Sequence, residues 1–404
     1  MKPNSSDGGN RDSLTLDFTS VAPDSGGVGV VASGVAQGLR SCGVPFRCLV
    51  DSGSHQSWVE GFPDLADVLV STEIHLAATS DWQRSLRRLV PRSSWLAQEL
   101  IGRVRQIRAR SSSRLIGQGV VWQPFHRAPI TTTRGVVTVH DLRVFEPGLA
   151  SVMDQRIIEH NVREAAAVIC SWPHPYYSLI ERFPFAQRKT FLVPLPVLNP
   201  GPWQTHVAPR GDAFRILLPG FITPHKNHEV LIRALPELAG GRVVFTGSED
   251  GTHGYFLRDL AQRLGVSDRI EWLGFVESER LEAEYARADL MVMPTRWEAA
   301  SGPVFESILR GLPFVTSDIP PLASQLAELR LDGATFDPDS PEDLAGAVRA
   351  TLASYDETVS RLRPVAEDLR VRSWADMAHE YNRIFNWVAG TADKPTELMK
   401  GAIE

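Results

Sequence analysis

Two carboxylates, Glu298 and Glu306, lie eight residues apart on either side of a segment that is suited to bind an anion. Pro303 fits the first position of a helix, because its fixed φ suits that position and no N–H hydrogen bond is lost. The loop 299–302 would then present free backbone N–H groups at a helix N-terminus, where a diphosphate or sugar hydroxyls can bind. One carboxylate can point at a sugar and the other at a ribose. Two ordinary surface glutamates are the alternative.

Lysine is scarce in this chain, and one lysine stands where a helix is predicted to begin. Only five of the 42 basic residues are lysine, and Lys226 follows a strand that ends at Pro219-Gly220. A positive charge at a helix start is unfavourable unless an anion is bound there, and a compact ammonium group is a good partner for phosphate. Gly220, His225 and Lys226 therefore form a candidate diphosphate site, with an ordinary surface lysine as the alternative.

Further candidate residues follow other predicted strands. His140, Asp141 and Arg143 come at the end of the strand 135–140. A lone histidine is more often structural, but a strand-end His-Asp pair with a neighbouring arginine favours a functional site. Gly247 and Phe275 follow two later strands and are candidates for the ribose and base side of a nucleotide site. Plain strand-end turns are the alternative for both.

Gly26 and Gly27 open a glycine-rich segment after the first strand. Glycines there let the backbone approach a phosphate. A dinucleotide-binding domain for hydride transfer would need Gly-x-Gly-x-x-Gly and an acidic residue about 20 positions further on. The segment from Gly27 has Ala32 in place of the last glycine, although Asp51 stands at about the required spacing. That alternative stays open.

The elements that would position these residues alternate between strands and helices, which is typical of α/β domains with a mainly parallel sheet. Strands are predicted over 14–18, 46–50, 135–140, 165–171, 190–194, 214–218, 242–246, 269–273, 290–294 and 313–316, and helices over 30–39, 228–238, 255–264, 279–288, 303–310 and 373–388. Every candidate residue follows a strand, where ligands bind in open α/β sheets.

The Pro- and Gly-rich segment 194–212 has the composition of a linker and divides the chain. We predict an α/β protein with two Rossmann-like domains. The predicted order is a flexible tail (1–12), a first domain (13–200), a second domain (201–372), a last helix (373–388) and a polar tail (389–404).

Composition excludes several classes of protein. Of the 404 residues, 43% are hydrophobic and 22% charged, which is unlike a disordered, collagen-like or coiled-coil chain. The net charge of −6 argues against nucleic-acid binding. No run of 18 apolar residues and no signal-like N-terminus is present, and three cysteines without metal-type spacing favour a reducing cytoplasm. No metal site is predicted.

The segment 84–114 carries nine arginines and one acidic residue, Glu99, with apolar residues interleaved. A solvated arginine-rich helix or loop is one interpretation. A patch for an anionic acceptor or for the inner face of a membrane is the other.

The segment 289–318 resembles the Glu-x7-Glu segment of the retaining GT-B glycosyltransferases, in particular glycosyltransferase family 4. The resemblance includes the Ala-Asp-Leu that precedes Glu298 and the Gly-Leu-Pro-Phe-Val that follows Glu306. The loop 220–227 is similar to that family's Gly-x-x-x-Pro-[Arg]-Lys loop, although Phe221 and His225 stand where many relatives have an arginine. The helix 373–388 is similar to the family's last helix, which crosses back onto the first domain.

The resemblance assigns roles to the residues of the second domain. Glu298 would hold the hydroxyls of a donor sugar and Glu306 the ribose of its nucleotide. The backbones of Ser301, Gly302 and Val304 would line the sugar and the diphosphate. Lys226 would neutralise the leaving diphosphate.

The first domain receives its roles from the same resemblance. His140 would lie near the reacting sugar carbon, where it positions the donor and stabilises the transition state without attacking the carbon. Arg143 and Asp141 would lie on the acceptor side. Gly26 and Gly27 would face the diphosphate.

The activity that the resemblance implies is the transfer of a sugar from a nucleoside-diphosphate donor to a hydroxyl acceptor, with retention of the anomeric configuration. The acceptor would be a glycan, a lipid-linked sugar or a natural-product intermediate, bound across a central cleft, and no cofactor or metal is expected. A nucleotide-sugar epimerase or hydrolase of the same fold is one alternative. A catalytically degenerate binding protein is another, because Ala299-Ala300 replaces the family's usual glycine-rich Gly-Phe-Gly. The base, the sugar, the acceptor and the oligomeric state stay open.

Overall fold

The computed structural model divides the chain into two compact units. Unit 1 is made of Met1–Leu198 and Ser373–Glu404, and unit 2 of Asn199–Arg372. The structure describes residues 13–23, 26–72, 119–126, 130, 132–146, 152–197, 200–209, 211–248 and 251–399. The predicted N-terminal tail 1–12 and the arginine-rich segment 84–114 lie outside the described residues.

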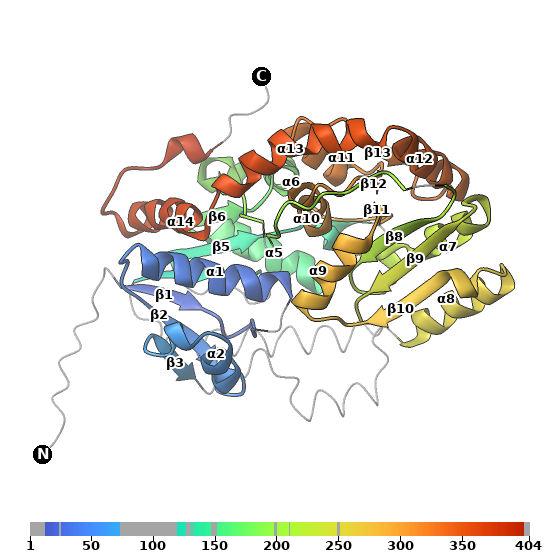
Figure 1. Cartoon of the computed structure of the whole chain (residues 1–404). Helices are drawn as coiled ribbons and strands as arrows, with labels where there is room; N and C mark the ends of the chain where they lie inside the picture. The colour runs from blue at the N-terminus through green and yellow to red at the C-terminus, as the bar shows by residue number, and fades with distance from the viewer. Residues whose placement is uncertain are drawn as a thin grey trace, which may run out of the picture. The chain divides into compact units, whose positions relative to one another are not determined.

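Unit 1 is built on a parallel sheet with the strand order β3-β2-β1-β4-β5-β6-β7. Its strands are β1 (Leu14–Asp17), β2 (Phe46–Asp51), β3 (Leu69–Thr72), β4 (Val120–Gln123), β5 (Gly135–Val139), β6 (Ala167–Cys170) and β7 (Thr190–Leu192) (Figure 1). Its helices are α1 (Gly27–Ser41), α2 (His55–Gly61), α5 (Val152–Glu164), α6 (Pro173–Arg182) and α14 (Trp374–Ala389), with short 3₁₀ turns between them. From β1 the chain adds β2 and β3 on one side, and it then adds β4 to β7 on the other side. The strand order therefore reverses between β1 and β4.

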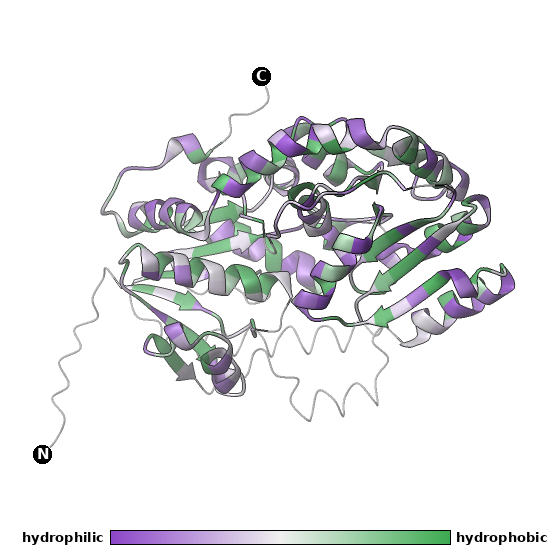
Figure 2. Ribbon diagram, viewed as in Figure 1, coloured by the Kyte–Doolittle hydropathy of each residue, from purple (hydrophilic) through white to green (hydrophobic). Residues whose placement is uncertain are grey.

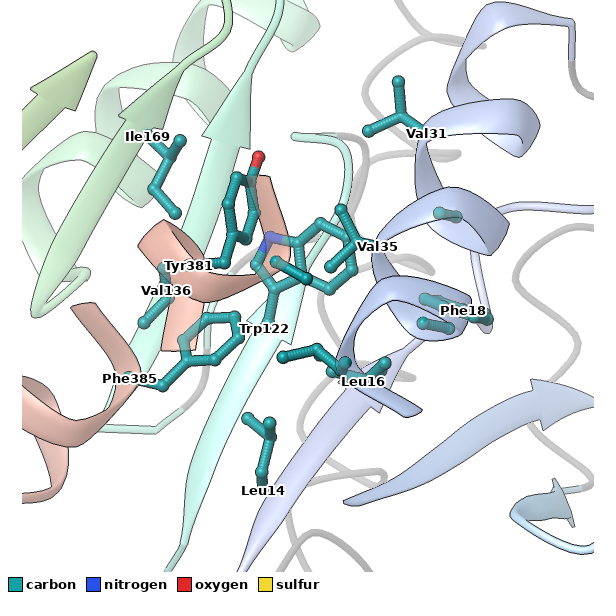
Figure 3. Close-up of a cluster of buried hydrophobic side chains, with 14 of the residues drawn as sticks. Leu14, Leu16, Phe18, Val31, Val35, Trp122, Val136, Ile169, Tyr381 and Phe385 are labelled. Atoms are coloured by element: carbon teal, nitrogen blue, oxygen red, sulfur yellow. The ribbon is translucent and has the colours of Figure 1, made fainter. Parts of the chain in front are cut away.

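The core of unit 1 is completed by the C-terminal helix. Trp122 of β4 is fully buried, and the rings of Tyr381 and Phe385 from α14 pack against it (Figure 3). The indole N–H of Trp122 donates a 2.9 Å hydrogen bond to the Thr138 hydroxyl, which lies 3.2 Å from the hydroxyl of Tyr381. Thr138 and Tyr381, which are 243 positions apart in the chain, therefore share a polar contact inside an apolar core.

Unit 2 repeats the same architecture on a smaller parallel sheet with the order β10-β9-β8-β11-β12-β13. Its strands are β8 (Phe214–Pro219), β9 (Gly241–Thr246), β10 (Ile270–Gly274), β11 (Leu290–Met293), β12 (Phe314–Ser317) and β13 (Ala334–Phe336). Its helices are α7 (His228–Ala234), α8 (Gly251–Arg263), α9 (Ser278–Arg287), α10 (Gly302–Arg310), α11 (Pro320–Glu328), α12 (Pro341–Ala353) and α13 (Tyr355–Val371). The strands are largely hydrophobic, as expected for a sheet covered on both faces (Figure 2).

The predicted fold class, an α/β protein with two Rossmann-like domains, is confirmed. The observed elements differ from the predicted ones mainly at their ends. The glycine-rich segment after the first strand is not a separate turn before a helix at 30, because α1 already begins at Gly27 and Gly26 is its N-cap, with a φ of 62°. Gly29 lies inside this first turn, where a Cβ would stand 2.5 Å from the carbonyl oxygen of Pro23. Close packing against the preceding loop thus explains why position 29 is a glycine.

The predicted polar tail 389–404 is wrong for its first part. Leu398 and Met399 are partly buried against the core of unit 1, and the ammonium group of Lys394 lies 5.2 Å from the ring centre of Trp387. The segment after α14 folds back because it carries these two apolar residues, which gain by leaving water. Residues 400–404 lie outside the described part of the chain.

A groove of small residues on α1 receives Trp374, the first residue of α14. A Cβ on Gly34 would stand 2.5 Å from the Trp374 ring, and one on Gly38 would stand 2.4 Å from the Trp374 carbonyl oxygen. Contacts shorter than 3.0 Å cannot be accommodated without movement. The two glycines are therefore what allows α14 to lie against α1.

We predict that Gly34→Ala lowers the stability of unit 1 by about 1–3 kcal/mol, because the added methyl group overpacks the contact with Trp374. The matched control is Gly346→Ala within α12, where a Cβ would meet nothing within 4 Å. That change should raise stability by about 0.5–1 kcal/mol through helix propensity. Scanning calorimetry of both variants measures the effects, and equal shifts in the two would contradict the packing argument.

Candidate functional site

Two candidate residues of unit 2 lie at the carboxyl ends of β8 and β11, where the strand order of the sheet reverses. Lys226 lies in the loop after β8, and Glu298 lies in the loop after β11. Such a switch point is where open α/β sheets bind their ligands, because the loops of the two central strands diverge there. The sequence alone places both residues after strands, and the structure makes those strands neighbours.

Lys226 and Glu298 form an ion pair between the Nζ atom and Oε1. Their side chains are only 17% and 14% exposed, so the pair is largely shielded from water. The sequence assigns the two residues to separate parts of a ligand, one to a diphosphate and the other to a sugar. The structure brings their opposite charges into direct contact.

Backbone contacts hold these two loops together. The carbonyl oxygen of His225 accepts hydrogen bonds from the Arg296 N–H (2.8 Å) and from the Thr295 hydroxyl (3.0 Å). The imidazole Nδ1 of His225 lies 3.2 Å from the Thr223 hydroxyl. Asn227, with a φ of 55°, donates a 2.7 Å hydrogen bond to the carbonyl of Pro338. The loop that carries Lys226 is therefore fixed at both ends.

Two glycines permit the close approach of neighbouring strand ends. Gly247, after β9, has a φ of 104°, and a Cβ there would stand 2.3 Å from the carbonyl oxygen of Gly220. Gly220 itself has a φ of 133°. The Gly247 N–H also donates to the carbonyl of Gly274 at the end of β10. Phe275 follows directly and is 66% exposed, which leaves its ring accessible to a planar group.

The loop before α10 differs from the prediction in two respects. The N–H of Ser301 is not free, because it donates a 2.7 Å hydrogen bond to the side-chain oxygen of Gln325 on α11. Gln325 also donates to the Ser301 carbonyl at 3.1 Å, so the amide clamps this residue from both sides. Helix α10 begins at Gly302, which makes Pro303 its second residue instead of its first. Any anion at this helix start must use N–H groups other than that of Ser301.

Glu306 lies further along α10 and is held from a neighbouring helix. The hydroxyl of Tyr285 on α9 donates a 2.8 Å hydrogen bond to its Oε2 atom. Its Oε1 atom lies toward the start of the helix, 3.8 Å from where a Cβ on Gly302 would stand. Val304 is buried, so only its backbone can serve a ligand.

His140 follows β5 in unit 1, and both of its ring nitrogens have hydrogen-bond partners. Nδ1 lies 2.8 Å from the Ser171 hydroxyl, and Nε2 lies 2.9 Å from the carbonyl oxygen of Pro124. A carbonyl only accepts, so Nε2 carries the proton and Nδ1 accepts from the serine. Burial lowers the pKa of His140 to about 4, so the ring is neutral near pH 7.

The residues around His140 are arranged by local contacts. Asp141 accepts a 3.2 Å hydrogen bond from the N–H of Arg143, whose guanidinium Nε lies 3.9 Å from the same carboxylate. The Arg143 side chain is 43% exposed and can reach a ligand in solution. Gly26 and Gly27 lie at the N-terminus of α1, at the end of the strand where the unit 1 sheet reverses. Each unit therefore has a helix N-terminus near its switch point.

Three residues that support these sites were not predicted: Tyr285, Gln325 and Ser171. Tyr285 lies in a predicted helix, where helical periodicity would place it on the buried face, but its partner on another helix has no signature in the sequence. Gln325 and Ser171 contact residues 24 and 31 positions away. Only the order of the strands brings such residues together.

Within the described ranges, no group of three or more His, Cys, Asp or Glu side chains could hold a metal ion. Among the helices that the structure describes, none is long and apolar enough to cross a membrane. Neither finding assigns a ligand to the site.

Two histidines with lowered pKa values, His140 and His228, should make the protein sensitive to acid. Burial lowers the pKa of His140 to about 4 and that of His228 to about 3, each from 6.5. Between each lowered pKa and 6.5, the unfolded chain binds a proton at that histidine and the folded chain does not. The free energy of unfolding is therefore highest above about pH 6.5 and falls as the pH drops toward 4 and 3.

The His228→Leu variant tests the contribution of one of them. The ring of His228 packs 4.9 Å from that of Phe245, and among the residues that the structure describes neither of its ring nitrogens has a hydrogen-bond partner. We expect the variant to lose less stability than the wild type between pH 7 and pH 4.5, by on the order of 2 kcal/mol. Thermal midpoints at both pH values measure this, with the exposed His379→Leu as control. An unchanged pH slope in His228→Leu would contradict the assignment.

Comparison with known proteins finds a family match within unit 2. Residues 204–368 match the family model of the glycosyl transferases group 1. An uncharacterized glycosyltransferase of Methanocaldococcus jannaschii is 28% identical over 178 residues, which make up 43% of this chain and 45% of that protein. The chain thus matches less than half the length of this relative, and the match falls short of half of this chain.

Solved structures extend the likeness to both units. The sucrose-phosphate synthase of Thermosynechococcus elongatus has a TM-score of 0.68 and 16% identity, covering 94% of this chain and all of that one. The Anabaena protein HepE, solved in complex with UDP-glucose, has a TM-score of 0.64 and 16% identity, covering 94% of this chain and 98% of that one. At these identities the structures show a shared fold. Residues of unit 2 thus match the model of the glycosyl transferases group 1, and the two units together have the GT-B fold of two Rossmann-like domains.

Proposed function

We propose that this protein transfers a sugar from a nucleoside-diphosphate sugar to a hydroxyl acceptor, with retention of the anomeric configuration. The observation that carries the proposal is the gathering of Lys226, Glu298 and Glu306 at the switch point of unit 2, inside the segment that matches the family model. The UDP-glucose held by the Anabaena protein of the same fold supports a donor of this class.

The donor would bind by exchanging partners with the ion pair of Lys226 and Glu298. An incoming diphosphate carries more negative charge than Glu298, so it would draw the ammonium group of Lys226 toward itself. Glu298 would then be released to accept hydrogen bonds from the hydroxyls of the sugar. Because both side chains are largely buried, each needs a new partner, and the donor supplies both at once.

The nucleotide would lie along the neighbouring loops. Glu306 accepts from ribose hydroxyls, and the exposed ring of Phe275 offers a surface for the base. The diphosphate lies at the start of α10, where the helix dipole favours negative charge. Lys226 and this helix N-terminus carry the charge of the leaving group, so the proposal requires no metal and no cofactor.

The transfer step needs no carboxylate nucleophile in this proposal. The leaving phosphate oxygen accepts the proton of the acceptor hydroxyl, and that hydroxyl attacks the sugar carbon from the face that the phosphate leaves. His140 is neutral, and the contacts with Ser171 and Pro124 fix its ring, so its role is to position groups. Arg143, with Asp141 beside it, is a candidate contact for the acceptor.

A panel of nucleoside diphosphates and their sugar conjugates tests the donor site. We expect one base to raise the thermal midpoint of the protein, because a ligand at 100 times its dissociation constant adds about 2.7 kcal/mol to the stability. The shift should not depend on magnesium. No response to any member of the panel would contradict the assignment of Lys226, Glu298 and Glu306. A shift that appears only with magnesium would contradict the metal-free proposal.

Replacing Lys226 tests whether the protein is an enzyme. Lys226→Met keeps the length of the side chain and removes its charge, so sugar transfer or donor hydrolysis should fall by at least about 100-fold. The exposed Arg349→Met in the same unit is the control for loss of a positive charge. Product formation is followed by release of nucleoside diphosphate, with and without a pool of hydroxyl acceptors.

Three results of this assay separate the alternatives. Nucleotide release that requires an acceptor supports transfer. Release without one supports a hydrolase, and conversion of the donor into its epimer supports an epimerase. A wild type that binds the donor without turnover, and that merely binds it more weakly after Lys226→Met, would identify a binding protein.

A further inference from the structure

The carboxylate of Glu306 is held by a buried tyrosine that no ligand of the proposed reaction would touch. Tyr285 lies on α9 and is fully buried, and its hydroxyl donates the 2.8 Å hydrogen bond to Glu306 Oε2. Burial and the negative charge of Glu306 raise the pKa of Tyr285 well above its usual value, so the hydroxyl keeps its proton at any working pH. It therefore acts as a permanent donor to one carboxylate oxygen.

A buried arginine, Arg310, packs against the ring of Tyr285. The guanidinium of Arg310 lies 4.6 Å from the centre of the Tyr285 ring, and its Nε donates a 2.8 Å hydrogen bond to Glu282. Arg310 also donates to the main-chain carbonyl of Glu306 at 3.1 Å. Because Arg310 is only 1% exposed and paired, it has little freedom to move. The position of the tyrosine hydroxyl is thus set from α10, which carries both Arg310 and Glu306.

This arrangement fixes the direction in which Glu306 can accept hydrogen bonds. A carboxylate can rotate about its last torsion, which is broad and roughly two-fold. With Oε2 bonded to Tyr285, Oε1 is turned toward Gly302 at the start of α10. That is the side on which a diphosphate would lie at the helix N-terminus. A sugar ring joined to that diphosphate would present its hydroxyls to Oε1.

We propose that Tyr285 is a positioning residue for the nucleotide ribose, which it serves by orienting the carboxylate of Glu306 through its buried hydroxyl. The inference rests on the proposed function, because it requires a nucleoside diphosphate in unit 2. It goes further by separating two roles: Glu306 contacts the ribose, and Tyr285 determines how strongly that contact discriminates ribose from a sugar without hydroxyls.

The Tyr285→Phe variant tests the proposal with two ligands. The first is the nucleoside diphosphate that the wild type binds most tightly among UDP, GDP and ADP, and the second is its 2′,3′-dideoxy counterpart. We expect the variant to bind the ribonucleotide about tenfold more weakly, since one hydrogen bond to a charged group is lost. Its affinity for the dideoxy compound should change less than twofold. Isothermal titration calorimetry measures all four dissociation constants.

Tyr355→Phe is a matched control in the same unit. Tyr355 is also buried, and its hydroxyl has no hydrogen-bond partner in the described structure. The substitution removes the same atom without removing a contact, so it should leave the discrimination between the two ligands unchanged. A second variant, Glu306→Gln, should lose the discrimination by itself, and adding Tyr285→Phe to it should cause less than a twofold further change. The comparison of Glu306→Gln with the double variant still tests the proposal if Tyr285→Phe alone does not fold.

The outcomes distinguish failure of this inference from failure of the proposed function. A wild type that binds none of the nucleoside diphosphates overturns both. A wild type that binds the ribonucleotide and the dideoxy compound equally overturns the ribose role of Glu306, and the role of Tyr285 with it. Equal weakening of both ligands by Tyr285→Phe overturns only the positioning role, because a merely structural tyrosine would act on the two ligands alike.

Discussion

Parallel pairing of the strands is the constraint on which both candidate sites depend. In each of the two sheets, every strand pair that the structure describes is parallel, so all carboxyl ends within a unit lie at one edge. Residues that are distant in sequence but follow different strands are therefore brought to the same edge. The contact between Lys226 and Glu298, which are 72 positions apart, exists only because β8 and β11 are neighbours.

The loops at this edge are coupled by the backbone as well as by charge. The carbonyl of His225 accepts from both Thr295 and Arg296, so the loop after β8 and the loop after β11 share an acceptor. A ligand that moved one loop would strain hydrogen bonds of the other. The side chains, by contrast, can exchange partners without movement of the backbone. Donor binding in the proposed reaction thus requires side chains to rearrange while the backbone of the two loops stays in place.

Local signals in the sequence predict most of the secondary structure of the site but not its contacts. Runs of β-branched residues and strand-end glycines place β5, β8, β9 and β11 to within about two residues of their observed ends. Pro303 correctly predicts a helix start, although Gly302 is its first residue. The amide clamp of Gln325 on Ser301 could not be predicted, because it depends on the side-chain geometry of two separate loops. The hydrogen bond from Tyr285 to Glu306 was missed for the same reason.

The return of α14 to unit 1 affects the order in which the chain can fold. Trp122 lies at the centre of the unit 1 core, yet two of its ring partners, Tyr381 and Phe385, are synthesised only after all of unit 2. Unit 2 is continuous in sequence and can complete its own core once Arg372 has left the ribosome. During synthesis, therefore, the second unit can be finished while the first still exposes an apolar surface around Trp122. A ribosome-bound chain of this protein would expose that surface until α14 has emerged.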